Sequence, residues 1–323
     1  MNGWLITGAG GMLGRELRAR LAAASVPALP LTHADLDLTD TGAVARAIRR
    51  TRPAIVVNCA AWTDVDAAET REAEALRVNG DAVRGLARAC AATGSRLLHV
   101  SSDAVFPGRA SHPYDETARP APRTAYGRTR LAGERAVLEE LPRTGTVVRT
   151  AWLYGAYGPN YVRAMAASAT SGEGTLAVAH DQHGQPTWTR DVAGRLLALG
   201  RLPASQTTGI FHATCGGRTT WYDLAREVFR LCGADPDRVL PVDGASLGAV
   251  VPRPAWSVLG HDRWEESGLT PPRHWREALA VGLRSVTSDG PAGRRRPLAR
   301  RPLPSGARTT ALAAREPVRA LSG

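Results

Sequence analysis

The stretch WLITGAGGMLG, residues 4–14, decides the fold class. Its apolar start is typical of a buried strand, and residues 12–24 have the apolar spacing of an amphipathic helix. Gly8, Gly11 and Gly14 lie where the strand turns into the helix. Such glycines permit a tight turn and bring the backbone close to a pyrophosphate at the helix N-terminus. The stretch therefore predicts a dinucleotide-binding site, with Met12 and Leu13 beside the glycines.

Strand-like and helical runs alternate through the first half of the chain. The further strand-like runs are 54–60, 96–102 and 145–151, and the further helical runs are 41–51, 70–93 and 125–141. This alternation predicts a parallel sheet covered by helices on both faces, which is the Rossmann-type, doubly wound α/β fold.

The elements become shorter after residue 154. They are a helix near 160–170, a strand at 175–179, a helix at 188–201, a strand at 210–213, a helix at 219–232 and a helix near 273–284. We predict a Rossmann domain over 1–154, to which some later segments return, and a smaller C-terminal α/β substrate lobe over 155–285. Doubly wound sheets bind ligands at the carboxyl ends of their strands, so the cleft between the two parts is the expected site.

The positive charge is concentrated at the C-terminal end of the chain. The whole chain has a net charge of +11, and the residues after Ser285 supply +6 of it through eight arginines against Asp289 and Glu316. This segment, 286–323, is rich in Pro, Gly and Arg and lacks apolar periodicity, so we expect a disordered basic tail. We expect a solvated extension here and no nucleic-acid partner.

Composition and cysteine usage exclude several other classes of protein. Hydrophobic residues make up 43% of the chain, yet no apolar run approaches the roughly 18 residues that a membrane span needs. The N-terminus lacks the pattern of a signal peptide, so we expect a cytoplasmic protein without a membrane partner. The four cysteines (Cys59, Cys90, Cys215 and Cys232) are far apart and include no C-x-x-C pair. We therefore expect neither a disulfide framework nor a metal site.

Several later residues are candidates for cofactor binding. Asp37 and Leu38 follow the second strand region and are placed to meet the adenosine, and Ala60 and Ala61 follow the third strand, where the cofactor must lie close to backbone. Asn79 is a candidate polar contact, against the alternative of a buried amide that bends its helix. No acid at the end of the second strand clearly excludes a 2′-phosphate, so both NADPH and NADH are predicted cofactors.

Candidate catalytic groups follow the fourth strand. Ser102 stands at the strand's carboxyl end, where a hydroxyl can hydrogen-bond a substrate carbonyl oxygen. Ser101 points to the other face by strand alternation, where it holds either the cofactor or the sheet. Tyr126 and Arg130 are four residues apart on one helix face. A phenol with a pKa near 10 is a poor acid at neutral pH unless a neighbouring cation such as Arg130 stabilises its phenolate.

Eight motifs together resemble those of the extended short-chain dehydrogenase/reductases and, among them, the dTDP-4-dehydrorhamnose reductase family. In family order over about 1–285 they are TGAGGMLG, VVNCAAWTDVDAAE, VSSDAVFPG, YGRTRLAGE, VVRTAWLYG, DQHGQPTWT, TTWYDLA and VPRPAWSVL. The resemblance implies an NAD(P)H-dependent oxidoreductase of deoxysugar biosynthesis. Its implied reaction is hydride transfer to C4 of a dTDP-linked 4-keto-6-deoxy-L-sugar.

The resemblance also implies roles for individual residues. Tyr126 donates the proton, Ser102 orients the carbonyl, and Arg130 stands where the family has a lysine that holds the nicotinamide ribose. The residues implied to contact the sugar nucleotide are Ser102, Asp103, Trp152, Gln182, Gln185 and Arg253. No lysine occurs anywhere in the chain, so the arginine at 130 belongs to a chain-wide preference. Guanidinium keeps the charge of lysine but not its shape.

Other departures from the family bear on the substrate and on rival functions. Ser102 replaces the usual threonine and keeps its hydroxyl, whereas Ala104 replaces a tyrosine and removes one wall of the sugar pocket. Alanine at that step also disfavours dehydration, for which the related dehydratases use a glutamate. A sugar-nucleotide 4-epimerase and a non-catalytic, dinucleotide-binding regulatory subunit stay as alternatives. The sequence is compatible with a homodimer and does not fix which 4-keto-sugar is used.

Overall fold

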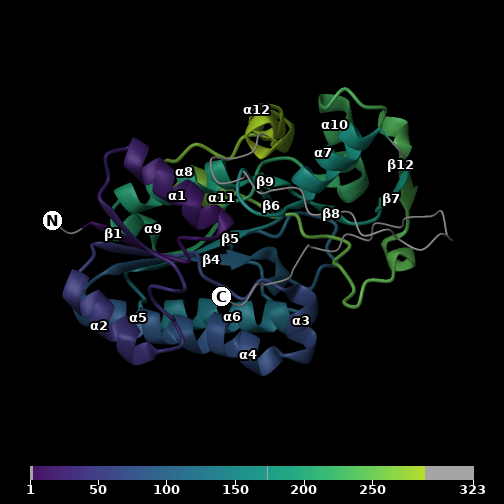
Figure 1. Cartoon of the computed structure of the whole chain (residues 1–323). Helices are drawn as coiled ribbons and strands as arrows, with labels where there is room; N and C mark the ends of the chain where they lie inside the picture. The colour runs from purple at the N-terminus through teal and green to yellow at the C-terminus, as the bar shows by residue number, and fades with distance from the viewer. Residues whose placement is uncertain (1–2, 173, 288–323) are drawn as a thin grey trace.

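A six-stranded parallel sheet forms the centre of the molecule, in the order β10-β5-β4-β3-β1-β2. The computed structural model describes residues 3–172 and 174–287. Helices cover both faces of the sheet (Figure 1), so the predicted Rossmann-type α/β fold is confirmed. The predicted basic tail lies almost wholly outside the described residues.

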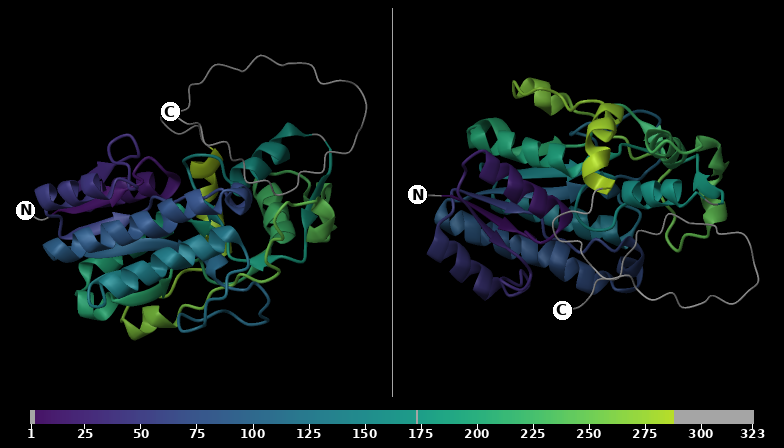
Figure 2. Two further views of the ribbon diagram at one scale, coloured as in Figure 1. Left: turned by 90° about the horizontal axis from the view of Figure 1, so that it is seen from below. Right: turned by 45° about the horizontal axis from the view of Figure 1, so that its top comes forward.

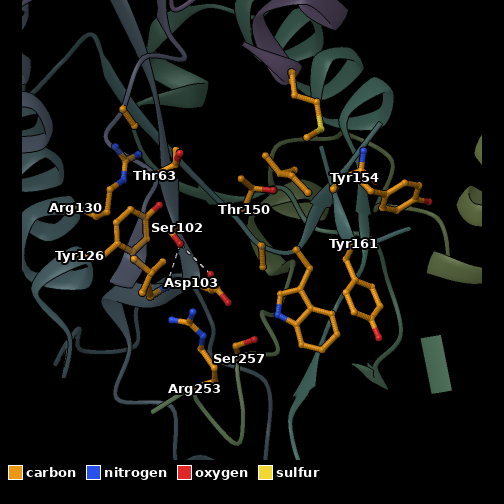
Figure 3. Close-up of a pocket in the computed structure, with 18 of the residues that line it drawn as sticks. Thr63, Ser102, Asp103, Tyr126, Arg130, Thr150, Tyr154, Tyr161, Arg253 and Ser257 are labelled. Carbon is orange, nitrogen blue, oxygen red and sulfur yellow. Dashed lines mark hydrogen bonds between the residues drawn. The ribbon is translucent and has the colours of Figure 1, made fainter. Parts of the chain in front are cut away.

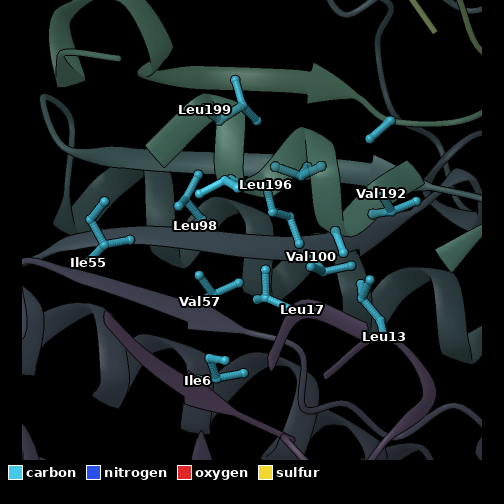
Figure 4. Packing of buried hydrophobic residues seen from close by; sticks show 14 of the residues in the cluster. Ile6, Leu13, Leu17, Ile55, Val57, Leu98, Val100, Val192, Leu196 and Leu199 are labelled. Carbon is cyan, nitrogen blue, oxygen red and sulfur yellow. The ribbon is translucent and has the colours of Figure 1, made fainter. Parts of the chain in front are cut away.

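The six strands of the sheet are short, and the four inner ones are largely buried. They are β1 (Trp4–Thr7), β2 (Ala28–Leu31), β3 (Ile55–Asn58), β4 (Arg96–Ser102), β5 (Gly145–Thr150) and β10 (Gly209–His212). Successive side chains point to opposite faces, so Leu5 packs into one apolar cluster and Ile6 into the other. Figure 4 shows the cluster around Ile6, where Val57, Leu98 and Val100 pack between the sheet and its helices.

The helices of the two layers are long enough to cover these strands. One layer contains α1 (Met12–Ala23) and α8 (Thr189–Arg201), with α9 (Ala204–Thr207) and α11 (Asp262–Glu266) near them. The other contains α2 (Thr41–Thr51), α5 (Ala82–Thr93) and α6 (Ala125–Glu140). Since α8 packs on α1 and β10 pairs with β5, the segment from 189 to 212 belongs to the Rossmann layers although it follows residue 155.

The predicted helix over 70–93 is interrupted, which corrects the sequence expectation. The chain forms α3 (Val65–Thr70), α4 (Glu72–Leu76), a π-helical turn (Arg77–Asp81) and then α5. Arg71 leaves the helical region with φ −130°, which separates α3 from α4. The π turn contains Asn79, whose amide bonds to a neighbouring loop and to α6. Such single turns are frequent at functional sites.

The smaller lobe has its own apolar core. Its elements are α7 (Tyr161–Ser171), β7 (Leu176–Ala179), α10 (Trp221–Leu231), β12 (Val239–Val242) and α12 (Trp275–Thr287). β12, which the sequence did not predict, pairs in parallel with β7. Short two-stranded pairings join the lobe to the sheet: β6 (Leu153–Tyr154) with β9 (Thr187–Trp188), and β8 (His183–Gly184) with β11 (Thr219–Thr220). Figure 2 shows the lobe beyond the end of the sheet away from the N-terminus.

A search of the described residues finds no helix that is both long and apolar enough to cross a membrane.

Candidate active site

A cavity of about 1650 Å³ lies between the strand carboxyl ends and the smaller lobe. Small-molecule pockets commonly measure about 300–1,000 Å³, so this one has room for a dinucleotide and a second large ligand together. Its lining comes from the glycine-rich loop, the ends of β3, β4 and β5, helix α6 and the lobe. The predicted cleft between the two parts of the chain is therefore present.

The glycine-rich loop forms a close-fitting cradle at the start of α1. Gly8 has a φ of +65°, and a side chain there would overlap the backbone of Ala60. A side chain at Gly14 would overlap the carbonyl of Gly8. The first turn of α1 contains no acidic residue, and Gly11 at its start has no side chain to cap the free N–H groups. These features fit an anionic pyrophosphate.

Buried polar side chains anchor this cradle from behind. Thr7 Oγ1 donates to Asn58 Oδ1 at 2.7 Å, and the Ala60 N–H donates to the same oxygen at 3.1 Å. The Asn58 amide nitrogen lies 3.0 Å from His99 Nδ1. Burial, together with the positive charge of Arg130, holds the pKa of His99 well below its usual range, so the ring stays neutral and accepts from Asn58. Asn58 thus fixes the loop that presents Ala60 and Ala61.

Asp37, Leu38 and His33, which follow β2, line the cavity beside the glycine-rich loop. Thr39 donates to Asp37 Oδ1 from its N–H at 2.9 Å and its hydroxyl at 2.8 Å, which lowers the pKa of Asp37. Asp37 is therefore ionised at neutral pH. Arg15 also lines the cavity and donates from Nε to the Gly10 carbonyl at 2.8 Å.

Helix α6 brings Tyr126 to the wall of the cavity opposite the lobe. The helix begins at Thr124, whose hydroxyl accepts from the Gly127 N–H at 3.0 Å. A side chain at Gly127 would overlap the carbonyl of Ala104, so α6 lies directly against the turn that follows β4. Figure 3 shows the Tyr126 ring beside Ser102 on this wall. The three groups predicted to be catalytic, Ser102, Tyr126 and Arg130, all line the cavity.

Ser102 and Asp103 form a hydrogen-bonded pair at the end of β4. Ser102 Oγ donates to Asp103 Oδ1 at 2.9 Å and accepts from the Ala104 N–H at 3.2 Å. Burial raises the pKa of Asp103 to about 6, against the opposing effect of hydrogen bonds from Ser102 and Ser257. A hydroxyl carries one proton, so Ser102 donates either to Asp103 or to a ligand carbonyl.

Arg130 is almost completely buried, with 2% of its surface exposed. Its Nη2 donates to the carbonyl oxygen of Val100, and its Nη1 lies 3.5 Å from Asn79 Oδ1. The guanidinium thus bridges α6, β4 and the π turn. It is a fixed positive charge one helical turn beyond Tyr126.

Asn79 is buried behind the cavity lining, and its contact with a cofactor stays a prediction. Its Oδ1 accepts from the Trp62 N–H at 2.9 Å, and its Nδ2 donates to the Trp62 carbonyl and the Thr129 hydroxyl at 3.1 Å each. The π turn points this amide inward between the loop after β3 and helix α6. Asn79 therefore braces α6 and helps to hold Arg130.

Gln185 also lies behind the cavity wall, and its contact with substrate stays a prediction. Its Oε1 accepts from the Leu259 N–H and the Thr214 hydroxyl at 2.8 Å each, and its Nε2 donates to the Leu259 carbonyl at 3.1 Å. All of its amide groups are used in fixing the segment that carries Ser257. Gln182, by contrast, lines the cavity.

Ser101 faces away from Ser102, as strand alternation requires. Its hydroxyl donates to Glu134 Oε1 at 2.6 Å on the buried side of α6. The Ser101 hydroxyl therefore joins the sheet to α6. Ser101 is also among the residues that line the cavity.

Aromatic side chains form the lobe's wall of the cavity. The Trp152 and Trp221 rings are stacked with centroids 3.5 Å apart, and Tyr161 lies against Trp221 at 4.6 Å. Trp152 has a φ of 47°, a strained conformation for a bulky residue of the kind found at ligand sites. A side chain at Gly184 would overlap the outer face of Trp152, so the indole is fixed between a glycine and a second indole.

Arg253 reaches across the cavity mouth from the lobe to the Rossmann layers. Its Nη2 donates to Asp66 Oδ2, at the start of α3, at 3.0 Å. Arg253 Nη1 and Asp66 Oδ1 are buried and find no hydrogen-bond partner among the described residues. Arg253 thus lines the cavity with its guanidinium held by Asp66.

The sequence reasoning missed several lining residues. Thr63, Thr150, Tyr154 and Ser257 all contribute to the wall and are labelled in Figure 3. Thr150 ends β5, so its position at a strand's carboxyl end was a usable signal. Ser257 had none, because only the return of the chain from the lobe brings it to Asp103. The described residues contain no group of three or more acids, histidines or cysteines that could hold a metal ion.

A Rossmann sheet with this glycine cradle, and with Tyr126, Arg130 and Ser102 on one wall, defines an extended short-chain dehydrogenase/reductase. The sequence model of a single family, the RmlD substrate binding domain, matches residues 1–288. The chain belongs to this family, that of the dTDP-4-dehydrorhamnose reductases, and is an oxidoreductase. The predicted family is confirmed.

Individual relatives agree with this assignment. The chain is 53% identical over 293 residues to the dTDP-4-dehydrorhamnose reductase of Streptomyces griseus, covering 90% of this chain and 95% of that protein. It is 50% identical over 286 residues to the dTDP-4-keto-6-deoxy-D-glucose reductase of Streptomyces niveus, covering 88% and 98%. Among solved structures, the dTDP-4-dehydrorhamnose reductase of Bacillus anthracis, in complex with NADP, aligns with a TM-score of 0.83 at 32% identity, covering 88% and 99%.

Proposed function

We propose that this protein uses NADPH or NADH to reduce the C4 ketone of a dTDP-linked 4-keto-6-deoxy-L-sugar. The observation that carries the proposal is the common wall formed by Ser102, Tyr126 and Arg130, beside a cradle that fits a pyrophosphate. The similar proteins of Streptomyces griseus and Streptomyces niveus are named as reductases of two different dTDP-linked keto sugars. The proposal therefore commits to the class of sugar and to the position of the ketone.

The chain's own residues would hold the cofactor in the cradle. The N–H groups at the start of α1 bind the pyrophosphate, Asp37 and Leu38 contact the adenosine, and Ala60 and Ala61 let the dinucleotide lie close to backbone. When bound, the reduced nicotinamide supplies the hydride. His33 and Arg15 line the same region and favour the additional phosphate of NADPH.

Ser102 and Tyr126 act on the ketone oxygen. Ser102 moves its hydrogen bond from Asp103 to that oxygen and so orients the carbonyl. Tyr126 then donates its proton to the oxygen as negative charge develops there. Arg130, one helical turn away, stabilises the phenolate that remains. A proton held on Asp103 would let that carboxyl donate to Ser102 Oγ and leave the serine proton free for the ketone.

The remaining lining residues would hold the sugar nucleotide. Arg253 lines the cavity, and its guanidinium suits a diphosphate, with which it can form charge-assisted hydrogen bonds. Gln182 and Asp103 offer polar atoms for sugar hydroxyls, and Trp152 offers the apolar edge of its indole. We place the reaction in the cytoplasm.

The proposal is tested by mixing the purified protein with NADPH or NADH and a dTDP-4-keto-6-deoxysugar while following nicotinamide absorbance. We expect loss of reduced nicotinamide in proportion to the deoxysugar formed. An epimerase would change the sugar without net oxidation of added NADPH. A regulatory subunit would bind NADPH without turnover. Either of those two results would overturn the proposal.

A further inference from the structure

A buried ion pair lies on the far side of β4 from the cavity. Arg149 on β5 donates to Glu134 on α6 through two parallel hydrogen bonds, Nε to Oε1 at 2.9 Å and Nη2 to Oε2 at 2.8 Å. Their side chains are 1% and 2% exposed. The carboxylate also accepts the hydroxyl of Ser101 at 2.6 Å. Three elements, α6, β4 and β5, therefore meet at one carboxylate.

Further neighbours complete the surroundings of Arg149. Its Nη1 lies 3.4 Å from His212 Nε2, and His212 Nδ1 lies 3.0 Å from the Gly260 carbonyl oxygen. Since that oxygen can only accept, His212 carries its proton on Nδ1 and offers Nε2 as an acceptor to the arginine. Phe106, just beyond the Ser102 turn, covers the guanidinium at 4.8 Å. The pair is thus fully hydrogen-bonded and shielded from solvent.

Glu134, Arg149 and Ser101 share their helix or strand with groups on the cavity wall. Glu134 is four residues after Arg130 and eight after Tyr126, so the three lie along one face of α6. Ser101 precedes Ser102, and Arg149 precedes Thr150 at the end of β5. Strand alternation turns Ser101 and Arg149 to the buried side and the next residues toward the cavity.

Stability alone does not account for such a pair. Removing two charges from water costs several kcal/mol per ion, and replacing a buried pair by apolar residues of similar volume is often neutral or stabilising. What an apolar cluster lacks is direction: the two parallel hydrogen bonds fix both the rotation and the height of α6 against β4 and β5. A displacement of about 1 Å at reacting groups can lower a rate about 100-fold.

We propose that the Glu134–Arg149 pair, with Ser101, is a positioning device that sets α6 against β4 so that Tyr126 and Ser102 reach the same substrate oxygen. This inference rests on the proposed reductase function. Neither charged residue touches the cavity, so the pair acts through Tyr126, Arg130 and Ser102. Its loss alters catalysis more than binding, since the cradle and the lobe's wall do not depend on it.

The decisive variant is the double substitution Glu134→Leu with Arg149→Met, which keeps the volume and removes both charges. We expect a folded protein with thermal stability near that of the wild type, KM for NADPH and sugar nucleotide within about threefold, and kcat lower by about 100-fold. If the pair served stability alone, a double variant with wild-type thermal stability would also have wild-type kcat, and that result would overturn the proposal. If the double variant fails to fold, Ser101→Ala tests the same proposal, because it leaves the ion pair in place. We expect kcat for Ser101→Ala to fall about tenfold at unchanged KM, whereas an unchanged kcat contradicts positioning.

A second bidentate pair, partly exposed, lies elsewhere in the fold and serves as a control. Asp191 on α8 and Arg273 before α12 form a bidentate pair at 2.7 and 2.8 Å, and neither residue lines the cavity. Asp191→Leu with Arg273→Met should leave kcat within about twofold of the wild type. An equal fall in kcat for this control would show a general loss of rigidity and would count against positioning.

One readout does not need the substrate. The ultraviolet titration of Tyr126, taken as the difference between each protein and its Tyr126→Phe counterpart, should move to higher pH in the Glu134/Arg149 double variant as the phenol separates from Arg130. An unmoved titration contradicts the proposal even if the wild type reduces none of the sugars offered. Inactivity of the wild type would itself overturn the proposed function and not the positioning.

Discussion

Arg130 donates from its Nη2 to the carbonyl oxygen of Val100, so the guanidinium is bound to strand β4 before any ligand arrives. Its second contact, from Nη1 to Asn79 Oδ1, joins it to the π turn. A charge held in this way stays near Tyr126 without needing the ribose of a cofactor to position it. Arg130 can therefore stabilise a Tyr126 phenolate through its charge, whereas its guanidinium differs in shape from the lysine that holds the nicotinamide ribose in the family.

Substitutions at Arg130 should separate the effect of its charge from the effect of its shape. Arg130→Met leaves the Tyr126 phenolate without a cation, and an opposite charge nearby is worth about one to three pKa units, so we expect kcat to fall by about 100-fold. Arg130→Lys keeps the charge, and we expect kcat within about tenfold of the wild type. Steady-state assays at saturating NADPH measure both.

The alkaline side of the pH profile gives a sharper test of the charge at position 130. Tyr126 must be protonated to act as the acid, and a cation at 130 lowers its pKa, so activity should fall at the pH where the phenol ionises. Arginine and a lysine with an ordinary pKa near 10.4 are both charged at that pH, so Arg130→Lys should keep the alkaline limit of the wild type, whereas Arg130→Met should move it to higher pH. An alkaline limit of Arg130→Met equal to that of the wild type would mean that the charge at 130 does not support the phenolate.

Arg253 should govern affinity for the sugar nucleotide. Arg253→Met removes the guanidinium from the cavity lining, and we expect KM for the dTDP-sugar to rise at least about tenfold while KM for NADPH is unchanged. Asp66→Asn weakens the competing ion pair and should lower that KM by about two- to threefold. Arg128→Met, which breaks an exposed pair with Glu72, is the control and should change neither value.

Gly184 should be needed for the aromatic wall. An alanine there overlaps the Trp152 ring and must displace it from Trp221, so we expect Gly184→Ala to raise KM for the sugar nucleotide by about tenfold. Gly194→Ala on α8, where the added methyl meets only Arg20 at ordinary contact distance, is the matched control. Equal kinetic constants for the two variants would show that the position of Trp152 is unimportant.

Glu116 should make the stability depend on pH. Burial, with a smaller effect from Asp262, raises the pKa of Glu116 from an ordinary 4.5 to about 7. Between these values the folded protein keeps a proton that the unfolded chain has lost. The resulting contribution to the free energy of unfolding is greatest below pH 4.5 and falls as pH rises to about 7, by at most about 1.4 kcal/mol per unit.

A neutral amide removes this dependence. Urea unfolding of Glu116→Gln and the wild type should show the variant gaining stability relative to the wild type as pH rises through that interval. A difference between the two proteins that stays constant with pH would contradict the buried, protonated state of Glu116.

Local patterns were sufficient for the sheet, the cradle and the catalytic wall. The glycine loop and the Tyr126–Arg130 spacing lie within single strand-to-helix units, where side-chain direction follows from the period of the element. The directions of the Asn79 and Gln185 side chains could not be predicted, because they depend on a π turn and on a distant loop at Leu259. Ser257 and the Glu134–Arg149 pair join elements far apart in sequence, and only the folded chain brings them together.

The central claim is that Tyr126 gives the proton during reduction of a dTDP-linked 4-keto sugar. The most direct measurement is kcat of wild type and Tyr126→Phe with NADPH and a dTDP-4-keto-6-deoxysugar, with NADPH binding measured on both proteins. Loss of a positioned general acid costs about 100- to 10,000-fold, so we predict a fall of this size in kcat with NADPH affinity unchanged. A Tyr126→Phe protein that turns over at the wild-type rate would contradict the mechanism.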